Sequence, residues 1–255
     1  ISSAATLAYN HSDAIQQGTA FPTAAITGAG NLVQVGSGTV ILTANNTYTG
    51  TTSAMGTGAV QFNATATSGS SVLNLDSTGS FILGSGVTAT ALTVSNAGRS
   101  STYSGVIGNG SGSLNVTLAG SGTQVLTGAN TYTGTTTLSG GVVNLGVDQV
   151  GTTSGPLGAS GTISLTGGTL QYSAANTRDY SSRFITGTNQ KYNVDTNGQN
   201  VTWATALTSA TSNLTKLGSG TLSLTAASTF TSGTVTINAG AIDVGGTSSA
   251  GALPS

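Results

Sequence analysis

The stretch GTQVLTGANTYTG, residues 122–134, decides the fold because the chain contains it three times. The other copies are GTVILTANNTYTG at 38–50 and GTLSLTAASTFTSG at 220–233, and each copy follows a Gly-Ser pair. The copies begin 84 and 98 residues apart, whereas one coil of a solenoid takes on the order of 20–30 residues. Each interval therefore predicts about four stacked coils, and the whole chain predicts roughly ten or eleven.

Apolar residues alternate with polar residues inside and after each copy. This period of two is typical of strands that bury one face. Turn residues such as Gly-Ser-Gly, Asn-Asn and Gly-Gly interrupt the alternation at the spacing expected between short strands. The equivalence of the copies predicts these core-facing residues: Val40, Leu42, Leu126, Val143, Leu145, Leu222, Leu224, Ile242 and Val244.

Two positions near the end of each copy are also equivalent. Asn46, Asn130 and Ser228 precede a Thr and an aromatic residue, and we expect them at one corner of the coil. The aromatic residue itself is expected to pack in the core, because Tyr and Phe replace one another there. These residues are Tyr48, Tyr132 and Phe230.

The chain divides into three parts by pattern. Residues 1–27 lack the repeat, and we expect them to form an N-terminal cap or a strand donated to a neighbouring subunit. Residues 28–248 are expected to form a β-solenoid, and residues 249–255 a C-terminal tail. The three repeat cores lie near 36–62, 120–145 and 218–244.

The run GSGTQVLTGANTYTGTTT at 120–137, followed by GGVVNLG at 140–146, resembles the autotransporter-associated β-strand repeat, also called the passenger-associated transport repeat. The resemblance covers roughly residues 28–248. It implies an all-β fold, a right-handed parallel β-solenoid on a bacterial cell surface or secreted from it. The family's prefix Lys is present only at Lys216, since Gln34 and Leu118 hold the matching places. A β-sandwich or jelly-roll subunit is the alternative, because short strands with frequent turns also fit it.

The composition excludes several classes of function. Five Lys and Arg, six acidic residues and one His cannot form the dense basic surface that nucleic-acid binding needs. There is no Cys, so disulfides and thiolate metal sites are impossible. Metal and phosphate-binding motifs are missing from the sequence, and no cofactor is expected. No apolar run reaches the length of a membrane span.

Catalytic constellations are weak. The sequence His11-Ser12-Asp13 contains the residue types of a hydrolase triad, but neighbours on a strand point to opposite faces, and a triad needs the imidazole between the other two. Asp179 and Asp195 share one region with cations, and the pairing of Asp179 with Arg178 and Arg183 is interpreted as a surface ion pair. We therefore predict that the protein is not an enzyme.

One region, residues 172–203, differs from the rest by its aromatic and charged residues. If the protein contacts a glycan or a partner, this region is the expected place. The candidate contact residues are Tyr180, Arg183, Lys191, Tyr192 and Trp203.

The leading functional prediction is a non-catalytic extracellular structural protein. It would be a building block of a surface fibre, stalk or adhesin that self-associates through the open strand edges at its ends. The alternative is a glycan-binding adhesin domain that uses residues 172–203. The chain begins at Ile1 without a leader, so we expect either that a leader has been removed or that this is a fragment.

Overall fold

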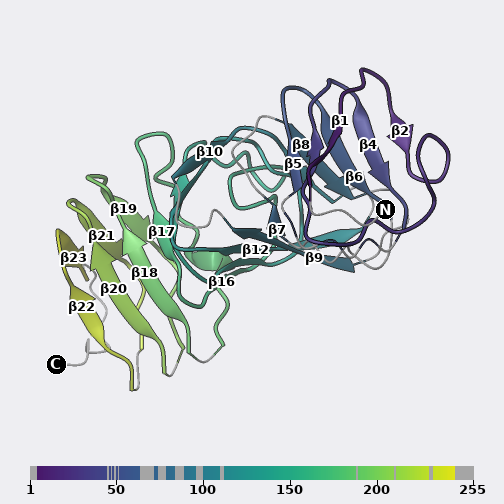
Figure 1. Cartoon of the computed structure of the whole chain (residues 1–255). Coiled ribbons are helices and arrows are strands. Elements are labelled where there is room, and N and C mark those ends of the chain that lie inside the picture. Colours follow the sequence, from purple (N-terminus) through teal and green to yellow (C-terminus); the bar gives the residue numbers. More distant parts are fainter. Residues whose placement is uncertain are drawn as a thin grey trace.

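The structure is a computed structural model in which the chain winds into a β-solenoid of about nine turns. The first strands lie at one end of the molecule and the last strands at the other (Figure 1). The model describes residues 5–44, 46, 48, 50, 52–63, 72–73, 79–83, 89–95, 100–109, 112–187, 189–209, 211–229 and 232–244.

The described strands form four sheets. The first contains, in spatial order, β1 (Leu7–Tyr9), β3 (Leu32–Gln34), β5 (Thr52–Ala54), β7 (Val72–Leu73), β9 (Ala89–Ser95), β12 (Ser113–Ala119), β14 (Thr136–Leu138) and β16 (Ile163–Leu165). The second contains β10 (Ser101–Tyr103), β13 (Thr123–Leu126), β15 (Val142–Leu145), β17 (Thr169–Gln171), β18 (Lys191–Asp195), β20 (Asn213–Leu217) and β22 (Val235–Ile237). The third contains β11 (Ile107–Gly108), β8 (Ser80–Leu83), β6 (Ala59–Phe62), β4 (Thr39–Leu42) and β2 (Ile15–Gln16), and the fourth β19 (Val201–Trp203), β21 (Thr221–Leu224) and β23 (Ala241–Asp243).

Strand pairing confirms the solenoid and excludes the sandwich alternative. Every pair of strands in the described part of the chain is parallel, whereas sandwiches and jelly rolls are built from antiparallel sheets. Paired residues lie 19 apart between β13 and β15 and 27 apart between β14 and β16. One coil therefore takes about the length that the repeat predicted. The expectation of ten or eleven coils was too high, because several coils carry long loops.

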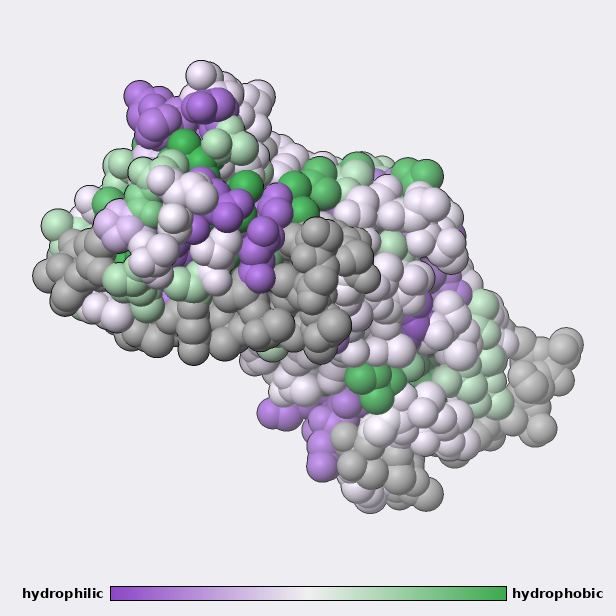
Figure 2. Space-filling model, turned by 90° about the vertical axis from the view of Figure 1, so that its right-hand side faces the viewer, coloured by the Kyte–Doolittle hydropathy of each residue, from purple (hydrophilic) through white to green (hydrophobic). Residues whose placement is uncertain are grey.

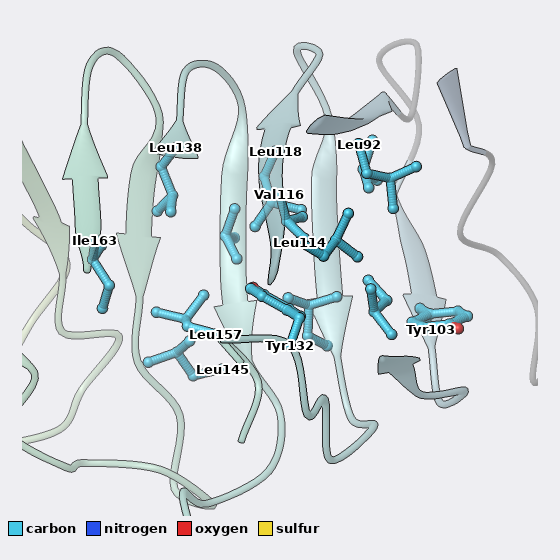
Figure 3. Close-up of a cluster of buried hydrophobic side chains, with 14 of the residues drawn as sticks. Leu92, Tyr103, Leu114, Val116, Leu118, Tyr132, Leu138, Leu145, Leu157 and Ile163 are labelled. Atoms are coloured by element: carbon cyan, nitrogen blue, oxygen red, sulfur yellow. The ribbon is translucent and has the colours of Figure 1, made fainter. Parts of the chain in front are cut away.

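The core lies between the sheets. In Figure 3, Val116, Leu118 and Leu138 of the first sheet point toward Tyr132, Leu145 and Leu157 on the other side of the coil. The predicted core residues are buried with two exceptions. Ile242 is half-buried, and the prediction for Val244 is wrong, since 49% of that residue is exposed. Both belong to the last described coil, where β23 has no strand partner on its far side.

The first coil is part of the same solenoid. Strand β1 pairs with β3, and β2 pairs with β4. Phe21 packs against Tyr9 with a ring-centroid distance of 4.9 Å, and Ile15 and Ile26 are buried. Residues 7–26 thus cover the start of the core within their own chain.

Helix is almost absent. The one helix in the described residues is η1, a short 3₁₀ turn at Ser181–Arg183. Consequently, no described segment forms a helix long and apolar enough to cross a membrane.

Candidate functional site

The repeat corner, defined as the position of Asn46, Asn130 and Ser228, joins each coil to the preceding one. The side-chain oxygen of Asn46 accepts a hydrogen bond from the Ile26 amide at 2.8 Å, and Asn130 accepts one from Ile107 at 2.8 Å. Ser228 accepts one from Leu207 at 3.0 Å. All three corner residues are buried, so each satisfies a backbone group that would otherwise be orphaned.

The aromatic residue two positions later belongs to the core, as predicted. The hydroxyl of Tyr48 lies 2.5 Å from that of Thr52, and the hydroxyl of Tyr132 lies 2.9 Å from that of Thr136. Burial raises the pKa of Tyr48 and of Tyr132 to about 12. Phe230, the third member, lies outside the described residues.

The strand register extends this equivalence to the hydroxyl partners. Leu32 pairs with Thr52 and Val116 with Thr136, and the matching pair in the third copy is Leu214 with Val235. The third copy therefore changes both members of the pair together, from Tyr and Thr to Phe and Val.

The position of the prefix Lys serves the Gly-Ser-Gly turn. Lys216 is buried, and its Nζ donates to the carbonyls of Leu217 and Gly218 at 2.7 Å each and of Ala239 at 3.2 Å. Burial lowers its pKa. Gln34 does the equivalent work in the first copy, where its Nε2 donates to the carbonyls of Gly36 and Gly38. This lysine is therefore a turn-binding residue.

The aromatic residues of region 172–203 lie in the core. The Trp203 indole donates to the Tyr172 hydroxyl at 2.8 Å and packs edge-on against Phe184 at 4.9 Å between ring centroids. Tyr180, Tyr192 and Trp203 each expose only 1% of their surface. None of these three candidate contact residues is available to a glycan in this conformation.

Arg183, another candidate contact residue, binds the loop of the preceding coil. Its guanidinium donates to the carbonyls of Gly161 and Leu157 at 2.7 and 2.5 Å and to the Gln149 side chain at 3.2 Å. The guanidinium also lies 5.7 Å from the centre of the Tyr180 ring. Burial lowers the pKa of Arg183. Of the five candidates, Lys191 alone is exposed.

The predicted surface ion pair at Asp179 does not form. One carboxylate oxygen of Asp179 accepts a hydrogen bond from the Ser181 amide at 2.7 Å, and the other accepts one from the Ala204 amide at 2.8 Å. Asp179 thus fixes a turn and the following coil. The Asp179 carboxylate accepts from backbone amides. The nearby cations in the sequence could not indicate this role.

A polar hollow of about 400 Å³ lies where two loops of neighbouring coils meet. The loops occupy residues 146–162 and 172–190. The residues that line the hollow are Asp148, Ala174, Ala175, Thr177 and Arg178. The sequence pattern did not indicate that Asp148 lines a hollow or that this loop has a role. The available signal was the unusual number of residues between GGVVNLG and the next strand.

The catalytic alternatives find no support in the geometry. His11 and Asp13 are exposed, with 3.6 Å between the imidazole Nδ1 and a carboxylate oxygen. In the described part of the chain, no three residues of the His, Cys, Asp and Glu types are grouped as metal ligands.

The family comparison agrees with the positions of the strands. A family model, the passenger-associated transport repeat, matches residues 32–56, 116–145 and 214–244. These segments run from β3 to β5, from β12 to β15 and from β20 to β23. No curated protein and no solved structure matches the chain significantly.

Proposed function

We propose that this chain, which carries three passenger-associated transport repeats, is a non-catalytic structural protein. It is a β-solenoid building block of a bacterial surface fibre, stalk or adhesin, and it acts outside the cell. One observation carries the proposal: the aromatic and charged side chains that marked a candidate site are mostly used to hold neighbouring coils together.

The repeat family supports the extracellular location. Passenger-associated repeats are found in the passenger regions of autotransporters, which are displayed or secreted. The chemistry agrees, because a chain without Cys has no thiol that the oxidising conditions outside the cell could convert to a wrong disulfide.

Self-association through the ends is the finer part of the proposal. The last described coil exposes about half of Ile237 and of Val244, and no described strand pairs with the far side of β22 or of β23. Free edges and uncovered apolar side chains favour the addition of further strands. Figure 2 views the other end of the molecule, where hydrophobic residues form separate patches between polar ones. The C-terminal end is therefore the stronger candidate.

Residues 1–27 act as a cap in this proposal. Donation to a neighbour would require β1 and β2 to leave β3 and β4 of their own chain and to pair with those of another. Mixing two isotope-labelled samples tests this, because exchange of strands would give contacts between differently labelled chains across β1 and β3. Contacts within one chain only support the cap.

Negative-stain microscopy and light scattering of the chain test the association. Rods or filaments that lengthen with concentration support it, and monomers at every concentration contradict it. The variants Ile237→Lys and Val244→Lys place a charge at the open coil and are expected to shorten the particles. The matched control is Val150→Lys, since Val150 is exposed on a loop elsewhere.

The non-catalytic part has a separate test. Incubation with a panel of polysaccharides and esters is expected to give no turnover, and His11→Ala is expected to change neither the fold nor any measured rate. A hydrolytic activity that disappears in His11→Ala would overturn the proposal.

A glycan-binding adhesin is the second candidate. The buried rings of region 172–203 do not favour it, but the polar hollow between the start of that region and Asp148 does. Its support comes from the two long loops, because loops that depart from a solenoid repeat often carry its binding surface.

A further inference from the structure

We propose that the hollow between Asp148 and Arg178 binds a neutral sugar. The inference rests on the second candidate function and is independent of the structural role. It moves the glycan contact from the buried rings of region 172–203 to the open surface beside them.

Buried amide side chains hold both walls in place. On one side, Gln149 is buried and donates to the carbonyls of Gly158 and Ala159 at 3.2 and 2.7 Å. Its own backbone amide donates to the Asp148 carboxylate at 2.8 Å. The Asp148 side chain is thus oriented by a residue that is itself fixed.

On the other side, Asn176 is buried and donates to the carbonyl of Val147 at 2.7 Å and to the Tyr180 hydroxyl at 2.8 Å. Its side-chain oxygen accepts a hydrogen bond from the Arg178 amide at 3.1 Å. Asn176 therefore ties the wall that carries Arg178 to the strand end that precedes Asp148. Such support reduces the entropy lost when a ligand binds.

The two charged residues do not neutralise each other. No salt bridge joins Asp148 to Arg178, and both side chains are exposed. The Arg178 guanidinium donates a long hydrogen bond of 3.4 Å from Nη1 to the Gln149 carbonyl. Carboxylate acceptors thus lie on one side of the hollow and guanidinium donors on the other.

This arrangement selects against charged and apolar ligands. Asp148 disfavours an anion, Arg178 disfavours a cation, and the polar lining offers little contact to an apolar group. Neighbouring hydroxyls of a neutral sugar can donate to a carboxylate and accept from a guanidinium at the same time. The Thr177 hydroxyl adds a group that can do either.

The size of the hollow suits a small ligand. A volume of about 400 Å³ lies in the range of small-molecule pockets and accommodates one or two sugar rings. The lining contains no aromatic ring on which a sugar could stack. We therefore expect weak binding, with a Kd in the roughly millimolar range.

Amide NMR of the labelled full chain, titrated with maltose, cellobiose and lactose, tests the proposal. Shifts are expected at residues 147–149 and 174–178 for at least one of these disaccharides. Asp148→Ala and Arg178→Ala are each expected to raise the Kd at least tenfold. The matched control Asp243→Ala removes an exposed charge outside the hollow and is expected to leave the Kd unchanged.

Three results would overturn the inference: no saturable shift with any of the disaccharides, equal loss in the Asp243→Ala control, or stronger shifts of the same amides with triglycine than with every sugar. Spectra of the two alanine variants outside the loops check that the fold is retained. A negative result here leaves the structural proposal untouched, because microscopy tests that separately.

Discussion

The repeat corners and the loop region at 146–190 solve the same problem in different ways. At a corner, a short side chain such as Asn130 accepts from one backbone amide of the preceding coil and donates to one carbonyl, that of Pro156. In the loop region, Arg183 binds two carbonyls and a side chain, and Gln149 binds several carbonyls. A short side chain is therefore sufficient at the corner, whereas the long loops are held by longer side chains.

This difference explains why the loop region resembled a functional site in the sequence. Charged and aromatic residues are rare in this chain, and they gather where the repeat is interrupted. Their clustering reflects packing, since Trp203, Tyr172 and Phe184 are buried and contact one another in the core. Composition alone cannot separate such a packing cluster from a binding surface.

The largest expected effect is a loss of folding stability at high pH, which involves the repeats and the loop region together. Tyr132 in a repeat and Tyr180 in the loop region have pKa values raised by burial to about 12, from 10.0. The unfolded chain loses these protons above pH 10 while the folded chain retains them. Their contribution to stability is therefore complete below pH 10 and is lost between pH 10 and about 12. In this range each such Tyr lowers the free energy of unfolding by about 1.4 kcal/mol per pH unit.

Circular dichroism and absorbance at the phenolate band, followed against pH, measure this loss. Phenolate is expected to appear together with unfolding, and Tyr132→Phe and Tyr180→Phe are each expected to reduce the slope. Ordinary phenolate titration in a folded chain would contradict the burial of these rings.

The next largest effect compares the two cores directly. Trp203→Ala, in the core that packs against the loop region, is expected to cost about 3–5 kcal/mol, and Leu126→Ala in a repeat about 2–5 kcal/mol. Both residues are 1% exposed, so both substitutions leave a cavity. Urea unfolding measures the two losses. A loss of less than about 0.5 kcal/mol for Trp203→Ala, as for a surface residue, would show that Trp203 is not part of the core and would make it a candidate ligand contact again.

A smaller effect tests the corner. Asn130→Ala leaves the Ile107 amide without its acceptor and the Pro156 carbonyl without its side-chain donor, and it is expected to cost about 1–3 kcal/mol. Asn130→Ser is the matched control, because Ser228 performs the same role in the third copy. It is expected to retain much of the stability in the same urea experiment. Equal losses in the two variants would mean that the corner depends on the size of the side chain.

The sequence predicted the fold where coils match and failed where they do not. The three copies located the strands, the corner and the core face correctly, because stacking forces equivalent residues into equivalent places. Val244 was placed in the core by the same rule, but a stacking rule assumes a further coil, and none of the described strands lies beyond β23. The hollow was missed because Asp148 and Arg178 belong to different loops, whose contact depends on how far each loop extends.

The smallest effects are expected at the two pairs of buried hydroxyls, Tyr48 with Thr52 and Tyr132 with Thr136. The second pair is hydrogen-bonded to the loop region, and the comparison of the two pairs measures the effect of that contact. Tyr48→Phe and Thr52→Val are each expected to cost about 0.5–1.5 kcal/mol, because each leaves a buried hydroxyl without its partner. The double variant is expected to lose almost nothing, since the third copy replaces both residues at once with Phe230 and Val235.

Thr136, however, also donates to the Leu157 carbonyl at 3.2 Å, and Leu157 accepts from Arg183. The double variant Tyr132→Phe/Thr136→Val is therefore expected to retain a cost that its counterpart in the first copy does not show. Urea unfolding of the four single and two double variants gives both coupling energies. Equal costs for the two double variants would show that the hydrogen bond from Thr136 to Leu157 in the loop region adds no stability.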